Sequence, residues 1–166
     1  MKTRRIESPL GSLDLFAEDG ALIGLNFQGE NTPPPNPDAE DCTEDVAVLD
    51  QTERELREYF AGKRKVFTMK LAARGTPFQM KVWKLLREIP FGETRAYVDL
   101  ALSLGDKNAV RAVGGANGKN PIAIIVPCHR VIGKDGSMTG FASGVHRKEQ
   151  LLALEGHAPR QGRLFD

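Results

Sequence analysis

The chain has 166 residues, of which 40% are hydrophobic and 27% are charged, and its formal net charge is +1. This length indicates one ordinary domain or two small ones and excludes a large multidomain assembly, while the composition excludes a disordered or fibrous chain. The longest aliphatic run, residues 122–126, is far shorter than the roughly 20 residues of a membrane span, and no apolar segment follows the basic first residues, so we expect a cytoplasmic protein with no membrane partner.

The charge is divided unevenly along the chain. Residues 1–75 carry 10 Lys and Arg against 14 Asp and Glu, whereas residues 76–166 carry 13 against 8. The second half is therefore the better candidate for a surface that faces a polyanion, although an excess of this size is also common in proteins that do not bind nucleic acid.

The first domain, expected over residues 1–74, begins with a predicted hairpin. Two strand-length segments, residues 11–17 and 21–27, are joined through Asp19 and Gly20. An Asp-Gly pair between two apolar runs is a strong signal for a tight hairpin turn.

The rest of this domain is predicted to be one helix and one strand. Proline-rich residues 31–38 cannot continue a sheet, and apolar residues at largely helical spacing predict a helix over 46–61 that ends at Gly62. Residues 66–71 alternate like one more strand and complete a small α+β unit, and residues 72–75 are the expected linker.

Helices dominate the prediction for the second half. Thr76 followed by Pro77 is typical of a helix N-terminus, and the helix is expected to end at residues 90–92. Two shorter helices follow, over 97–104 and from 108. Such a pair across a glycine-containing turn is either a DNA-binding helix-turn-helix or an ordinary helical hairpin.

The composition of the second short helix favours the helix-turn-helix. Small residues, among them Ala112 and Gly115, surround Arg111 on nearly every side. They lower helix propensity and would pack poorly in a core. This pattern is expected where another surface approaches the helix backbone closely.

The two cysteines have different surroundings. Cys42 follows the proline-rich stretch among acidic residues, which raise the pKa of a thiol, and we interpret it as an inert loop thiol. The sequence offers no set of three or four ligands for zinc, so no metal is predicted. Cys128 follows a predicted buried strand at 122–126 and precedes His129 and Arg130.

Cations beside Cys128 favour the thiolate, the nucleophilic form of the side chain. A buried structural cysteine with an incidental histidine is the alternative. If this segment is extended, Cys128 and His129 point in opposite directions, so His129 needs a turn or a bridging water to reach the sulfur.

The motif IVPCHRVI at residues 125–132 resembles the active-site motif of the O6-alkylguanine-DNA alkyltransferases. Further segments resemble family positions in order and at similar spacing: residues 75–79, 82–83, 89–90, 92–94, 111–114, 120–121, 140, 151–152 and 155–156. The resemblance covers residues 75–156 and leaves 157–166 as a flexible tail. The first domain resembles the family only in outline, which includes residues 59–62.

This resemblance implies an α+β fold in which a small ribonuclease H-like domain of sheet and helix precedes a winged helix-turn-helix catalytic domain. It implies direct-reversal DNA repair, in which guanine alkylated at O6, or thymine alkylated at O4, is flipped out of the duplex. Cys128 then takes the alkyl group irreversibly in a single turnover. The expected partner is double-stranded DNA, bound by a monomer, and no cofactor is expected.

The resemblance also assigns roles to individual residues. His129 accepts the proton of Cys128 through a water, Glu155 orients His129, and Tyr97 donates to the flipped base. Lys148 adds positive potential near the pocket. A solvated acid, a half-buried core tyrosine and a solvated lysine are the respective alternatives for Glu155, Tyr97 and Lys148.

The remaining implied roles concern DNA and the base. Arg111 fills the gap left by the extruded base, on a helix that enters the minor groove with its small residues Ala112 and Gly115. Asn120 fixes the turn that leads to Cys128. The base contacts are expected from the carbonyl oxygens of Cys128 and Val131 and from the amide of Ala142.

Two departures from the family pattern bear on substrate size. Phe141 lacks the hydroxyl of the family's usual aromatic residue, and Ser143 replaces a glycine and can narrow the pocket. Two other classes of function stay open, a lesion-binding protein without transfer and a Cys-His hydrolase. The reactive Cys128 argues against the first, and the adjacency of Cys128 and His129 after a strand argues against the second.

Overall fold

The computed structural model describes residues 1–27, 30, 32–34, 37–38, 42–138, 141 and 143–157. The chain divides into two compact units. The first comprises Met1–Arg74 together with Pro121–Ala123, and the second comprises Gly75–Asn120 and the chain from Ile124 onward. Among the described residues, no helix combines the length and apolar character that crossing a membrane requires.

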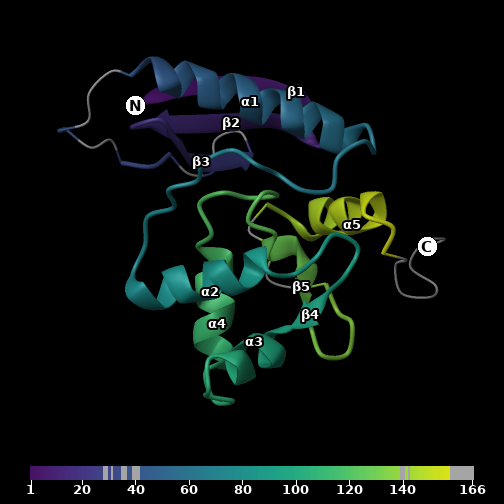
Figure 1. Ribbon diagram of the computed structural model, residues 1–166. Coiled ribbons are helices and arrows are strands. Elements are labelled where there is room, and N and C mark those ends of the chain that lie inside the picture. Colours follow the sequence, from purple (N-terminus) through teal and green to yellow (C-terminus); the bar gives the residue numbers. More distant parts are fainter. Residues whose placement is uncertain are drawn as a thin grey trace. The chain divides into compact units, whose positions relative to one another are not determined.

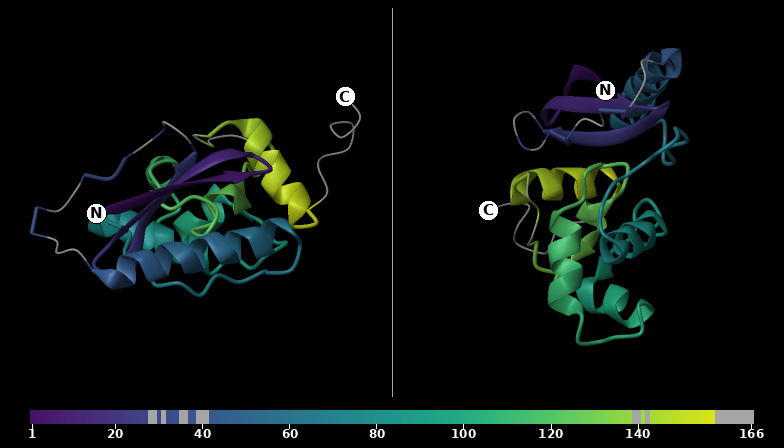
Figure 2. Two further views of the ribbon diagram at one scale, coloured as in Figure 1. Left: turned by 90° about the horizontal axis from the view of Figure 1, so that it is seen from above. Right: turned by 90° about the vertical axis from the view of Figure 1, so that its left-hand side faces the viewer.

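The first unit is built on a three-stranded antiparallel sheet. Its strands are β1 (Lys2–Ser8), β2 (Gly11–Glu18) and β3 (Ala21–Phe27), in that order across the sheet. Helix α1 (Thr43–Phe60) packs against all three strands and covers one face of the sheet (Figures 1 and 2). The hairpin prediction is confirmed.

The turn between β2 and β3 shows why Asp-Gly was a reliable signal. Asp19 and Gly20 have φ angles of 52° and 77°. Both are in the left-handed region, as the tight turn that suits the strand twist requires. The backbone N–H of Gly20 also donates to Oδ1 of buried Asp45 at 2.7 Å, which ties the turn to the start of α1.

Strand β1 was missed by sequence analysis because it lacks an apolar pattern. Of its seven residues, four are charged, and only Ile6 is buried. It lies at the edge of the sheet, where charged side chains can remain in water.

The predicted helix over 46–61 is present, with different bounds and a shifted face. α1 begins at Thr43, and Gly62 ends it with a φ of 75°. Val46, the first residue of the predicted apolar pattern, is 41% exposed, whereas Val48 is buried. The start was missed because the first turn is acidic and polar.

The strand predicted over 66–71 is wrong. The segment has only an isolated bridge between Leu71 and Leu22 of β3. The reason lies in α1, because the buried carboxylate of Glu55 accepts both the backbone N–H of Thr68, at 2.8 Å, and its hydroxyl, at 2.7 Å. That side chain takes a backbone donor that a strand would have used.

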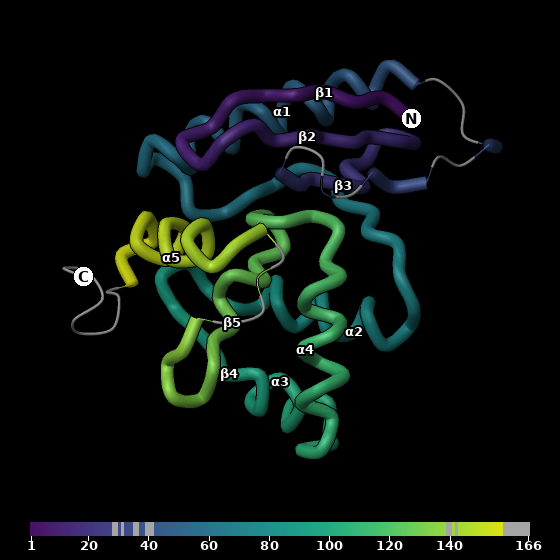
Figure 3. The backbone as a smooth tube through the Cα atoms, turned by 180° about the vertical axis from the view of Figure 1, so that it is seen from behind, coloured from purple at the N-terminus to yellow at the C-terminus, as the bar shows by residue number. Residues whose placement is uncertain are grey.

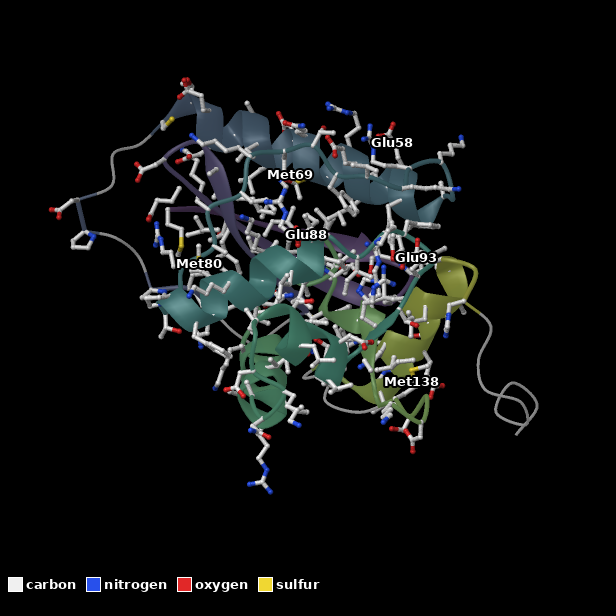
Figure 4. The ribbon with its side chains drawn as sticks, turned by 60° about the horizontal axis from the view of Figure 1, so that its bottom comes forward. Glu58, Met69, Met80, Glu88, Glu93 and Met138 are labelled. Atoms are coloured by element: carbon white, nitrogen blue, oxygen red, sulfur yellow. The ribbon has the colours of Figure 1, made fainter. Side chains whose placement is uncertain are left out.

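The second unit begins with α2 (Pro77–Arg87), which confirms the predicted N-terminus. Thr76 accepts from the backbone N–H of Gln79, and the Gln79 side chain accepts from the backbone N–H of Thr76, which forms a complete capping box. Met80 lies in the first turn, and Glu88, at the other end, is the C-cap residue (Figure 4). The helix therefore stops shortly before the expected end at residues 90–92.

The predicted pair of short helices is present. Strand β4 (Arg95–Ala96) leads into α3 (Tyr97–Ser103), and α4 (Val110–Gly118) follows after a turn at Gly105, whose φ is 82°. α4 packs against both α2 and α3 (Figure 3). Helix α5 (Val145–Leu154) closes the unit, and β5 (Val131–Ile132) pairs with β4 in parallel.

The buried strand predicted over 122–126 is also wrong. All five residues are buried, but only Ile122 forms a bridge, to Leu25 of β3. Two residues later Ile124 has a φ of 71°, in the left-handed region that β-branched residues rarely adopt. The chain therefore turns immediately after one rung of pairing.

Candidate active site

Cys128 lies at the start of a short turn rather than on an extended segment. Residues Cys128–Arg130 form a 3-10 helix, labelled η1, directly after Pro127. Cys128 is 6% exposed, and its backbone N–H donates to the carbonyl oxygen of Val126 at 2.8 Å. The expectation that Cys128 and His129 point in opposite directions, as on an extended strand, does not apply to this geometry.

Opposing effects act on the thiol of Cys128. Burial raises its pKa, and this effect dominates. A side-chain hydrogen bond from Asn120, the positive charge of Lys148 and the backbone N–H groups of Cys128 and His129 all lower it. The resting site therefore favours the neutral thiol, while the groups that stabilise a thiolate already surround it.

His129 and Glu155 form a buried pair. Nε2 of His129 lies 2.8 Å from Oε2 of Glu155, and neither side chain is exposed to solvent. Burial lowers the pKa of His129, against the raising effect of Glu155. Burial disfavours the charged form of Glu155, but hydrogen bonds from His129 and Arg130 outweigh it and lower the pKa of Glu155 to about 2.

These pKa directions fix the tautomer of His129. An ionised Glu155 can only accept, so Nε2 of a neutral His129 must carry the proton and donate it to the carboxylate. Nδ1 then holds a free lone pair. This nitrogen is buried and has no hydrogen-bond partner among the described residues. His129 is therefore prepared to accept a proton at Nδ1.

Arg130 was missed as a site residue. Its Nε and one terminal nitrogen donate to both oxygens of Glu155, at 2.8 and 2.9 Å, and the other terminal nitrogen donates to the carbonyl oxygen of Ile89 at 2.7 Å. The interpretation that Arg130 favours the thiolate of Cys128 directly is wrong, because its guanidinium is committed to Glu155. No sequence signal placed Glu155, 25 residues away, beside it.

Lys148 and Tyr97 lie close to each other. Lys148 is fully buried in α5, its ammonium donates to the carbonyl oxygen of Val131, and it lies 5.9 Å from the centroid of the Tyr97 ring. Burial lowers the pKa of Lys148 to about 8. The alternative of a solvated Lys148 is excluded, as is that of a solvated Glu155.

Asn120 lies between α4 and the active-site turn. Its Nδ2 donates to the carbonyl oxygen of Val126 at 2.7 Å, in addition to its bond to Cys128. The carbonyl oxygens of Cys128 and Val131 both have protein donors, the amide of Asn117 at 3.4 Å and the ammonium of Lys148. Ala142, the remaining expected base contact, lies outside the described residues, as do residue 140 and most of the tail.

Three of the expected DNA-binding residues share one face of α4. Arg111, Ala112 and Gly115 are all exposed. A Cβ atom built on Gly114, Gly115 or Gly118 would meet no atom within 4 Å, so the packing of the protein itself does not require these glycines. These glycines leave three positions of the helix that carries Arg111 without a side chain.

Two domain models of one family match nearly the whole chain. The model described as "6-O-methylguanine DNA methyltransferase, ribonuclease-like domain" matches residues 1–73, and the model described as "6-O-methylguanine DNA methyltransferase, DNA binding domain" matches residues 77–157. The chain belongs to the 6-O-methylguanine DNA methyltransferase family. The fold expected from the resemblance is thereby confirmed.

Individual members of the 6-O-methylguanine DNA methyltransferase family are similar over almost their full length. A methylated-DNA--protein-cysteine methyltransferase of Methanosarcina acetivorans is 49% identical over 150 residues, 90% of this chain and 95% of that protein. The Mycobacterium tuberculosis H37Rv protein of the same name is 45% identical over 98% of each chain. The crystal structure of Mycobacterium tuberculosis OGT in complex with DNA superposes with a TM-score of 0.81 at 44% identity, over 99% of each chain.

Proposed function

We propose that this family member repairs O6-alkylguanine in double-stranded DNA, and O4-alkylthymine with it, by moving the alkyl group to Cys128. The Sγ–carbon bond forms as the bond from that carbon to O6 breaks. The electron pair of the broken bond stays on the base, which takes up one proton to become guanine and so balances the proton that Cys128 gives up. The thioether on Cys128 is a poor leaving group, so each molecule reacts once.

The observation that carries this proposal is the chain of contacts behind the nucleophile. Arg130 holds Glu155, Glu155 holds His129, and the free lone pair of His129 at Nδ1 is the proton acceptor that the buried thiol needs. The proton moves from Sγ to Nδ1 through a bridging water. The imidazolium that results is stabilised by the ionised Glu155, as in other nucleophile-histidine-acid triads.

Groups around the flipped base assist its departure and hold it. Tyr97 at the start of α3 donates its hydroxyl proton as negative charge develops on the base. The carbonyl oxygens of Cys128 and Val131 accept from the exocyclic amine, as the resemblance implies, and the Val131 oxygen has a second lone pair beside the one that Lys148 engages. Lys148 supplies positive potential at the same place.

The exposed face of α4 delivers the base. The helix enters the minor groove, where Ala112 and Gly115 allow close approach, and Arg111 occupies the space left by the extruded nucleotide. Asn120 ties the end of this helix to the Cys128 turn. The protein works as a monomer in the cytoplasm, where thiols stay reduced.

The stoichiometry of methyl transfer tests the proposal. A duplex with labelled O6-methylguanine is incubated with limiting protein, and both repaired guanine and the mass of the protein are measured. We expect one equivalent of guanine and one methyl adduct on Cys128. A lesion-binding protein would leave no adduct, and release of more than one equivalent would exclude the single-use mechanism.

A further inference from the structure

Asn117 lies on the buried side of α4, opposite the exposed face. It is 2% exposed, whereas Gly115 is exposed. Two residues along a helix correspond to a rotation of about 200°, so Asn117 and Gly115 point in nearly opposite directions. The Nδ2 atom of Asn117 donates to the carbonyl oxygen of Cys128 at 3.4 Å. Helix α4 thus has an exposed face on one side and, on the opposite side, a hydrogen bond to the peptide of Cys128.

An amide is a costly residue at this position. The other buried residues of α4, Val113 and Ala116, are apolar. The Oδ1 atom of Asn117 is buried and has no hydrogen-bond partner among the described residues. A buried polar atom left unsatisfied destabilises the fold, so an apolar side chain of similar size would stabilise it better. The cost indicates a role other than packing.

The Cys128 carbonyl that Asn117 binds belongs to the active-site turn. It also accepts from the backbone N–H of Val131, which closes η1. The backbone N–H groups of Cys128 and His129 lower the pKa of the thiol. The orientation of these peptides therefore decides how well the sulfur is stabilised as a thiolate.

The end of α4 is a firm support for this contact. The indole N–H of Trp83 in α2 donates to the carbonyl oxygen of Ala116 at 2.9 Å. Asn120, three residues after Asn117, holds the carbonyl of Val126. The two amides hold the segment that leads to the nucleophile at two points, Val126 and Cys128.

We propose that Asn117 is a positioning residue that fixes the Cys128 peptide from the buried face of α4 and so keeps the sulfur beside the groups that stabilise its thiolate. The inference rests on the proposed function for its biological meaning, because it deepens the assignment of Cys128 as the nucleophile. Asn117 contacts the carbonyl oxygen of Cys128, and its effect is exerted through that peptide.

The test measures the reaction of Cys128 with iodoacetamide as a function of pH, in a Cys42→Ser background that leaves one thiol. Asn117→Leu keeps a similar volume and removes the donor. We expect the midpoint of the pH profile to rise by about one pH unit, which slows alkylation near neutral pH about tenfold. The thermal unfolding midpoint should stay at or above the parental value, because an unsatisfied polar atom is removed.

Val113→Ala is the matched control, since Val113 is fully buried on the same face of α4 and makes no polar contact with Cys128 in the described structure. It should lower the unfolding midpoint and leave the pH midpoint unchanged. Asn117→Ala removes the donor without adding a charge, so its pH midpoint should rise as far as that of Asn117→Leu. It also serves as the deciding variant if Asn117→Leu does not fold.

A parental pH midpoint in the Asn117 variants, or an equal shift in Val113→Ala, would overturn the assignment and leave Asn117 as a packing residue. Iodoacetamide needs only a thiolate, so this outcome does not depend on whether the protein accepts alkyl groups from DNA. Failure of the proposed function would be seen only in the duplex assay, as the absence of a methyl adduct on Cys128.

Discussion

Cys42 and Cys128 both have a thiol pKa above the ordinary value, but for different reasons. Cys42 is the N-cap residue of α1, a position where backbone N–H groups favour a thiolate, yet the hydrogen bond from its thiol to Glu44 raises the pKa. Burial raises the pKa of the Cys128 thiol, while Asn120, Lys148 and two backbone N–H groups lower it.

This difference shows that the resting pKa alone does not identify a nucleophile. The thiol of Cys42 donates to the carboxylate of Glu44, which is too weak a base to take its proton. Cys128 has donors that stabilise its thiolate, and the next residue, His129, can accept its proton. Glu155 binds His129, and Arg130 binds Glu155. Four changes test how far the contrast extends, from the largest expected effect to the smallest.

Replacing each thiol gives the largest contrast. Cys128→Ser should abolish methyl transfer, because a hydroxyl is far less acidic than a thiol, and should preserve DNA binding. Cys42→Ser should change neither property. Transfer from labelled duplex and electrophoretic binding assays measure both, and loss of transfer in Cys42→Ser would remove the distinction between the two cysteines.

Glu155→Gln removes the support of His129 without changing its shape. We expect methyl transfer to slow by about a hundredfold or more, as expected when the acid that orients a catalytic histidine is neutralised. The variant should also unfold more easily at neutral pH, because Arg130 is left buried and unpaired.

The pH dependence of stability is a second measurement on the same variant. The folded-state pKa of Glu155 is lowered from 4.5 to about 2, so its contribution to stability is present above pH 4.5 and is lost as pH falls toward 2. The difference in unfolding free energy between the parent and Glu155→Gln should therefore shrink over that interval. A constant difference would mean that folding does not lower the pKa of Glu155.

Arg111→Ala separates delivery of the base from the chemistry of Cys128. If Arg111 fills the vacated stack, repair of duplex DNA should slow by about tenfold or more, because extruding a base costs a few kcal/mol. Free O6-alkylguanine, which has no stack to leave, should react at nearly the parental rate. The second-order rate constants on both substrates decide the matter, and equal slowing would show that Arg111 shapes the pocket or the fold instead.

Glu44→Gln should give the smallest effect, at the other thiol. The hydrogen bond to Glu44 is the main cause of the raised pKa of Cys42, so its loss should make this thiol more reactive. In a Cys128→Ser background, iodoacetamide should react with Cys42 a few times faster at pH 8. An unchanged rate would show that other features of the helix N-terminus hold the thiol protonated.

Local signals predicted the parts of the fold that local interactions determine. Asp19-Gly20 specified the hairpin because its backbone conformation suits those two residues, and Thr76 specified a helix start because its partner, Gln79, is three residues away. The predicted strands at 66–71 and 122–126 failed for reasons that are distant in sequence or conformationally rare: the carboxylate of Glu55 and the left-handed backbone of Ile124.

The same division applies to the site. Cys128 and His129 could be chosen from their chemistry and their motif, and the buried pair of His129 and Glu155 agrees with the role that the resemblance implied. Arg130 and Asn117 could not be found in this way, because their roles depend on which partner each meets after folding. A buried arginine and a buried asparagine look like surface residues in a sequence.

The return of Pro121–Ala123 to the first unit has a consequence for how the protein is made and divided. During synthesis, residues 1–74 leave the ribosome well before the segment that bridges β3 at Leu25. The first unit therefore cannot complete its contacts until most of the second has been translated. A fragment cut at residue 74 would lack this segment, and the complementary fragment would carry it without its strand partner. Fusion or fragment designs should keep the two units on one chain.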